Sequence, residues 1–249
     1  MQRYFLNEPY EAKAEFTVTG ENFHHIAHVM RMSPGQKIYL VFDEQIAILA
    51  EILRVSADEV VVVERKKEVA EKELPIQVTI ACGYPKGDKL DWIVQKGTEL
   101  GAQEFIGFPA KTSVVKWDHK KINKKKQRLE KIAVEAAEQS HRQLAPKILL
   151  LESKQALIEC FTMYDYVIVA YEESAKAGER SRFATLLAQM VSGQRVLLIF
   201  GPEGGLAKEE IQVFQEHQAE LCGLGPRILR TETAPLYALS AISYQFELV

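Results

Sequence analysis

A strand-length apolar run that ends in a glycine- and proline-rich turn constrains this chain more than any other feature. The run Arg195–Phe200 reads Arg-Val-Leu-Leu-Ile-Phe, the turn is Gly201-Pro-Glu-Gly-Gly205, and residues 206–210 then open a polar helix. In α/β proteins, small ligands bind beyond the carboxyl end of a strand in this context. Glycine lets a ligand touch bare backbone there. The pattern predicts a ligand-binding α/β domain.

A second loop, residues 223–235, has the same character. It opens with glycines and a proline and ends at Thr233, which we expect to cap a final helix with Pro235 in its first turn. Neither loop contains Gly-x-Gly-x-x-Gly or a P-loop lysine, and Pro202 removes a backbone N–H. A purine ring therefore suits the loops better than a pyrophosphate. Taken singly, each loop is equally compatible with an ordinary surface turn.

Taken together, the two loops are far more specific. Gly-Pro-Glu-Gly-Gly, followed in the second loop by Leu-Gly-Pro-Arg-Ile-Leu-Arg-Thr-Glu-Thr-Ala, resembles the bacterial 16S rRNA uracil-N3 methyltransferases of the SPOUT superfamily. The resemblance spans nearly the whole chain and includes residues 86–96, 99–101, 138–140, Arg142, His24, His25, 29–31 and 34–35.

The resemblance implies an α/β protein with a small PUA-like β-barrel RNA-binding domain over residues 1–70. A SPOUT methyltransferase domain with a C-terminal trefoil knot would follow over residues 71–249. It also implies S-adenosylmethionine (AdoMet) as cofactor, N3 of a uridine in 16S rRNA of the 30S subunit as substrate, and a homodimer. The implied cofactor contacts are Phe200, Gly201, Pro202, Glu203, Gly204, Leu224, Gly225, Pro226, Leu229 and Arg230.

Methylation of uracil N3 requires the methyl group in line with N3 and a route for the N3 proton to leave. We expect Arg230, Glu232 and Arg142 to act in catalysis. Without the resemblance, Glu232 is explained more simply as a carboxylate favoured by a helix start. The expected RNA contacts are the basic residues Arg3, Arg31, Lys124, Lys125, Lys131 and Arg142.

Charge is distributed unevenly along a chain whose net charge is −3. Residues 111–147 carry eleven Lys and Arg against four Asp and Glu, whereas residues 1–73 carry nine against thirteen. The basic segment over residues 111–147 can contact phosphates. A helix face that meets only solvent explains its excess of positive charge equally well.

Other functional classes receive little support. The three cysteines are widely spaced, and no carboxylate or cysteine completes a metal site beside His24, His25 and His28. We therefore expect buried thiols and no metal.

No apolar run reaches membrane-spanning length and no secretory signal pattern is present, so we expect a cytoplasmic protein.

The pattern of secondary structure changes near residue 75. Short β-rich runs come first, a charged stretch over residues 65–73 reads as a linker, and strands then alternate with helices as in a parallel sheet. The expected strands include residues 36–42, 47–55 and 59–64. The expected helices include residues 22–30, a basic helix at 123–140 and an uncharged last helix at 234–246, and a loop is expected at 172–182. A helix that is apolar all round is buried in the core or against another subunit.

Two alternatives to an AdoMet-dependent methyltransferase stay open. One is a non-catalytic RNA-binding protein that retains the fold, although intact glycine loops argue against it. The other is an enzyme that uses a nicotinamide or flavin nucleotide, which the absence of Gly-x-Gly-x-x-Gly disfavours.

Overall fold

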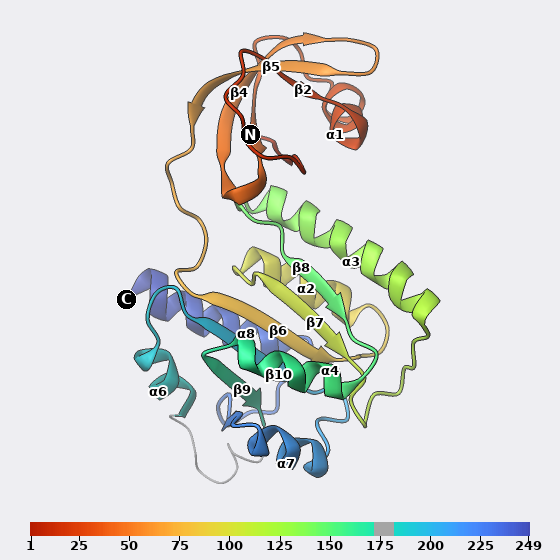
Figure 1. Cartoon of the computed structure of the whole chain (residues 1–249), viewed down its shortest axis with the longest axis vertical. Coiled ribbons are helices and arrows are strands. Elements are labelled where there is room, and N and C mark those ends of the chain that lie inside the picture. Colours follow the sequence, from red (N-terminus) through yellow and green to blue (C-terminus); the bar gives the residue numbers. More distant parts are fainter. Residues whose placement is uncertain (172–181) are drawn as a thin grey trace. The chain divides into compact units, whose positions relative to one another are not determined.

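The computed structural model describes residues 1–171 and 182–249, so the loop expected over residues 172–182 lies almost wholly outside the described part. The described chain forms two compact units (Figure 1). One contains Met1–Glu73 and Ala137–Ala145, and the other contains Leu74–Ala136 and Pro146–Val249. The sequence assigned all of residues 71–249 to one domain, whereas the structure groups Ala137–Ala145 with the N-terminal residues.

The first unit is a curled five-stranded sheet with the strand order β1-β3-β4-β5-β2. Strand β1 pairs with β3 in parallel, and the other pairings are antiparallel. Alternate residues such as Ile38 and Leu40 face the core, as the two-residue period of a strand requires. The elements are β1 (Arg3–Phe5), β2 (Phe16–Val18), α1 (Gly20–His24), η1 (His25–Val29), β3 (Lys37–Val41), η2 (Asp43–Gln45), β4 (Ala47–Val55) and β5 (Val60–Lys67).

The charged stretch over residues 65–73 is ordered by ion pairs and is not a free linker. Strand β5 continues through Lys67. The Glu68 carboxylate then accepts hydrogen bonds from Arg3 at 2.6 Å and from Lys72 at 2.7 Å. Acidic residues in this stretch are therefore fixed partners of basic ones, which charge composition alone does not reveal.

The second unit is a six-stranded, wholly parallel sheet with the strand order β11-β9-β10-β6-β7-β8. Its strands are β6 (Gln77–Gly83), β7 (Glu104–Phe108), β8 (Lys147–Leu150), β9 (Tyr166–Ala170), β10 (Arg195–Phe200) and β11 (Glu220–Cys222). The other described elements are α2 (Lys89–Glu99), α3 (His119–Gln139), α4 (Lys154–Glu159), η3 (Cys160–Met163), α6 (Arg182–Gln189), α7 (Lys208–Glu216), α8 (Thr233–Ser243) and η4 (Tyr244–Leu248).

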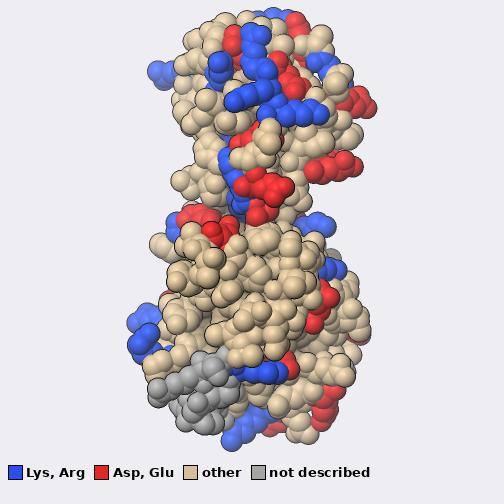
Figure 2. All heavy atoms as spheres, turned by 90° about the vertical axis from the view of Figure 1, so that its left-hand side faces the viewer, with Lys and Arg blue, Asp and Glu red and all other residues tan. Residues whose placement is uncertain are grey.

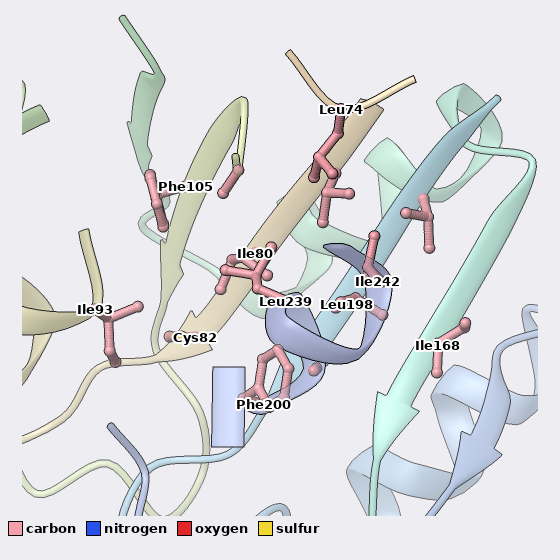
Figure 3. Close-up of a cluster of buried hydrophobic side chains, with 14 of the residues drawn as sticks. Leu74, Ile80, Cys82, Ile93, Phe105, Ile168, Leu198, Phe200, Leu239 and Ile242 are labelled. Atoms are coloured by element: carbon pink, nitrogen blue, oxygen red, sulfur yellow. The ribbon is translucent and has the colours of Figure 1, made fainter. Parts of the chain in front are cut away.

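Helices cover both faces of this sheet. In β10, Leu198 and Phe200 belong to the cluster that contains residues of α2, α3, α6 and α8, whereas Leu197 and Ile199 belong to the cluster with α4 and α7. Figure 3 shows side chains of α8 packed beside those of the strands in the first of these clusters. Central strands buried on both sides explain why β10 reads as a continuous apolar run.

The final helix, α8, carries no charged residue and is followed by the π-helical turn η4. Its buried side faces the core through Ala238, Leu239 and Ile242, but Tyr237 is 43% exposed and Tyr244 is 62% exposed. Figure 2 looks from the side on which Figure 1 places the C-terminus, and the surface of the second unit there is largely uncharged. An uncharged face with exposed aromatic residues is typical of an interaction surface.

Candidate active site

A pocket of about 710 Å³ lies at the carboxyl end of β10, within the size range of small-molecule sites. This is where an open parallel sheet is expected to bind a ligand. The lining residues come from the two glycine-bearing loops, from the ends of other strands and from α2: Lys89, Thr112, Ala170, Tyr171, Phe200, Gly201, Pro202, Glu203, Gly204, Gly205, Leu206, Ala207, Lys208, Ile228, Leu229, Arg230, Thr231 and Ala234.

The first loop is closed tightly on itself. A Cβ atom added to Gly201 would lie 2.6 Å from the carbonyl carbon of Gly205 and 2.8 Å from the backbone nitrogen of Leu206. A Cβ atom added to Gly83, at the end of β6, would lie 2.6 Å from Cδ of Pro202. Gly201 is therefore required by a close backbone approach and Gly83 by the approach of the Pro202 ring, before any ligand is considered.

A neighbouring segment explains Gly204. An added Cβ atom there would lie 2.9 Å from Cβ of Thr112, and the Thr112 hydroxyl donates a hydrogen bond to the carbonyl of Gly205. The buried Glu210 carboxylate makes a second connection, because it accepts hydrogen bonds from the backbone N–H groups of Ala207 and Lys111, both at 2.9 Å. The segment after β7 is thus tied to the first loop, a contact that the sequence did not predict.

Lys89, at the start of α2, forms ion pairs with two glutamates of the site. Its Nζ lies 3.0 Å from Oε1 of Glu203 and 3.4 Å from Oε2 of Glu232. The hydrogen bond to Glu203 is the main cause of the raised pKa of Lys89. Burial acts to raise the pKa of Glu203, but backbone hydrogen bonds, including that from Lys86, and the Lys89 ammonium outweigh it, so this pKa is lowered.

Sequence reasoning did not single out Lys89, although it lies within the segment 86–96 that carried the family resemblance. The lysine connects the first loop, the residue before α8 and the start of α2. Its role depends on a three-way contact between segments far apart in the chain, which no local pattern reveals.

The second loop contributes to the pocket through its later residues. Ile228, Leu229 and Arg230 line it, whereas Leu224, Gly225 and Pro226 are not among the described lining residues. The carbonyl of Arg230 accepts hydrogen bonds from the backbone N–H groups of Thr233 and Ala234. The helix therefore begins at Thr233, with Glu232 as the N-cap residue in place of the expected Thr233.

Arg3 and Arg142, which the sequence assigned to RNA, are buried in the first unit. Arg142 is 3% exposed, its guanidinium forms an ion pair with Glu73, and its carbonyl accepts a hydrogen bond from Arg3 at 3.1 Å. Arg3 is 1% exposed and also lies over the ring of Tyr39. Both arginines hold Ala137–Ala145 and the N-terminal sheet in one unit, so the structure gives them a structural role in place of the surface contact that we predicted.

The remaining predicted RNA contacts lie on the surface. Arg31 is exposed, with a φ of 51°. Lys124, Lys125 and Lys131 line a shallow groove along α3 together with Arg128, whose Nε donates to Asp91 at 2.8 Å. The helix begins earlier than expected, at His119, so its basic character covers a longer surface.

Across residues 1–171 and 182–249, no three His, Cys, Asp or Glu side chains come together as a metal site would require. Tyr4 and His25 instead form a hydrogen bond of 2.9 Å. Within the same residues, no helix combines the length and the apolar character that crossing a membrane requires.

A family model described as an RNA methyltransferase domain matches residues 72–243, and one described as an RNA methyltransferase PUA domain matches residues 18–65. Ribosomal RNA small subunit methyltransferase E of Bacillus subtilis is 50% identical over 254 residues, which cover 100% of this chain and 98% of that protein. The chain belongs to the ribosomal RNA small subunit methyltransferase E family.

Solved structures in and around this family have the same fold. A crystal structure described as that of a hypothetical protein is 47% identical, with a TM-score of 0.93 and coverage of 99% of both chains. The methyltransferase E of Neisseria gonorrhoeae, solved with bound S-adenosyl methionine, is 26% identical, with a TM-score of 0.82 and coverage of 99% of this chain and 98% of that one. The expected fold class, a SPOUT-type α/β domain with an N-terminal PUA domain, is confirmed.

Proposed function

We propose that this chain transfers the methyl group of AdoMet to N3 of a uridine in 16S rRNA of the small ribosomal subunit. The observation that carries the proposal is the pocket framed by both glycine-bearing loops, in a chain of this family. The AdoMet-bound relative from Neisseria gonorrhoeae supports the choice of cofactor.

The residues of the pocket fit AdoMet. Leu206, Ile228 and Leu229 offer apolar contacts to an adenine ring, and the backbone of the first loop offers N–H and C=O partners. Bound AdoMet supplies an electrophilic methyl group on a sulfonium centre. The expected cofactor contacts of Leu224, Gly225 and Pro226 remain a prediction.

The reaction also needs help at uracil, because N3 must lose its proton when it takes the methyl group. We assign Glu232 to accept that proton and Arg230 to stabilise the negative charge that develops on the uracil oxygens. Arg230 lines the pocket, and Glu232 lies 3.4 Å from Lys89, which also lines it. Arg142 receives no catalytic role, because its side chain is buried and forms an ion pair with Glu73.

Binding of RNA would rest on cations that are exposed or half-buried on the two units. Arg31 in the PUA domain and Lys124, Lys125 and Lys131 on α3 can contact phosphates without reading sequence. We further propose a homodimer that covers the uncharged surface of α8 and the start of η4, where Tyr237 and Tyr244 are exposed. We also propose that this chain contains the C-terminal trefoil knot that the family resemblance implies.

The alternative is a non-catalytic RNA-binding protein with the same fold. Calorimetric titration with AdoMet separates the two, because a protein that had lost catalysis would have no need of an intact cofactor pocket. We expect saturable binding with one site per chain. If AdoMet does not bind while RNA does, the alternative is correct.

A further inference from the structure

We propose that a second pocket of the methyltransferase unit binds a nucleobase of single-stranded RNA next to the target uridine. This inference rests on the proposed function and specifies how its substrate is held. The pocket has a volume of about 390 Å³ and lies at the ends of β6 and β7. Its walls include Tyr84, Ala110, Lys111, Ser113, Lys116 and Trp117.

Contacts with neighbouring residues fix the aromatic wall of this pocket. The rings of Tyr84 and Trp117 have centroids 4.2 Å apart, and the Tyr84 hydroxyl donates to the carbonyl of Leu151 at 2.8 Å. A Cβ atom added to Gly107 would lie 2.5 Å from Cε1 of Tyr84, so glycine in β7 makes room for this ring. Tyr84 is buried, whereas Trp117 is half-buried. A positioned indole at a pocket wall is the feature on which unpaired bases stack.

Charge around the indole favours a nucleotide. Lys116 is exposed beside Trp117 and has no ion-pair partner in the described part of the chain, and Lys125 Nζ lies 5.8 Å from the Trp117 ring centroid. Glu152, the acidic residue in the wall, lies 2.8 Å from Nδ1 of His119. Oγ of Ser113 is buried without a hydrogen-bond partner among the described residues, and a polar edge of a base would supply one.

A single loop connects this pocket to the cofactor pocket. Thr112 lines the cofactor pocket and bonds to Gly205, while the residues on either side of it, Lys111 and Ser113, line the second pocket. The hydrogen bond from Lys111 N–H to Glu210 fixes the same loop. An RNA strand with its target base at the cofactor would therefore lay a neighbouring nucleotide across this loop. Lys125, which lines the basic groove of α3, lies 5.8 Å from the Trp117 ring centroid.

The two tryptophans of the chain allow a direct test. Trp92 is 59% exposed on α2, so Trp92→Phe leaves Trp117 as the sole indole reporter. A short single-stranded oligouridylate should quench the fluorescence of this variant in a saturable manner. The matched variant Trp117→Phe, which retains Trp92, should not respond. An abasic oligonucleotide of the same length should not quench Trp117, because it offers phosphates but no base.

Equal quenching of Trp117 by the abasic strand would overturn the proposal in favour of a phosphate site, and no quenching at saturating RNA would overturn it outright. In methylation assays, Trp117→Ala should raise KM for small subunits by about tenfold or more, the effect of losing one base–aromatic stack. AdoMet affinity should not change, and Trp117→Phe should retain most of the activity.

A wild-type KM in a folded Trp117→Ala protein would also contradict this inference. Failure of the wild-type protein to methylate subunits would instead refute the proposed function. The fluorescence titration would then still decide whether the second pocket binds a base.

Discussion

Nζ of Lys89 lies 3.0 Å from Oε1 of Glu203, and this ion pair joins the first turn of α2 to the first glycine-bearing loop. The same ammonium group is 3.4 Å from Glu232, the residue before α8. One cation thus holds three separate segments around the pocket. Such an arrangement orders the loops before the cofactor arrives, which reduces the entropy lost on binding.

The first prediction concerns this lysine. Lys89→Met should weaken AdoMet binding by roughly threefold to tenfold, because partly exposed ion pairs contribute about 1 kcal/mol or less each and two are lost. Lys89→Arg should retain most of the affinity, since it keeps the charge between the carboxylates. Titration calorimetry on both variants checks this, and equal affinities for wild type and Lys89→Met would show that the lysine does not order the pocket.

The second prediction concerns the first loop. Gly201→Ala should reduce AdoMet affinity by more than about tenfold, because the added methyl group meets the backbone of Gly205 and must displace the loop. Gly193→Ala is the control: its φ is 87°, so strain of about 1 kcal/mol is expected, but nothing lies within 4 Å of the new Cβ. Unchanged AdoMet binding by a folded Gly201→Ala protein would contradict the proposed cofactor site.

The third prediction separates structure from RNA contact in the first unit. Glu73→Gln should lower the free energy of unfolding of this unit by about 3–5 kcal/mol, because it removes the carboxylate from the ion pair with the buried Arg142 guanidinium. Arg31→Ala, at an exposed position, should change it by about 0.5 kcal/mol or less. Urea unfolding followed by circular dichroism measures both, and similar midpoints for the two variants would argue against the structural role of Arg142.

The fourth prediction addresses α3. Replacing Lys124, Lys125 and Lys131 together with glutamine should weaken RNA binding and flatten its dependence on salt by about one unit of slope per lost phosphate contact. AdoMet affinity should be unaffected, because none of the three lines the cofactor pocket. If the salt slope of the triple variant equals that of the wild type, these three lysines of α3 meet only solvent and do not contact RNA phosphates.

The pattern of the sequence predicted the parallel sheet, the two loops and the basic and uncharged helices, because strand period, glycine turns and helical stripes are local properties. The roles of Arg3 and Arg142 could not be predicted in this way. An isolated arginine has the same appearance whether it meets phosphate or a distant carboxylate, and here Arg142 meets Glu73. Similarly, Gly204 lines the pocket, but its close contact with Thr112 comes from a segment far away in the sequence and could not be predicted.

Identification of the methylated nucleoside tests most directly whether the chain methylates N3 of a uridine in small-subunit rRNA. Small subunits that lack the modification would be incubated with AdoMet carrying a labelled methyl group, and their rRNA would then be digested to nucleosides. We predict label in 3-methyluridine, with much less in the Gly201→Ala variant. Label in another nucleoside, or none in the presence of demonstrated AdoMet binding, would contradict the account.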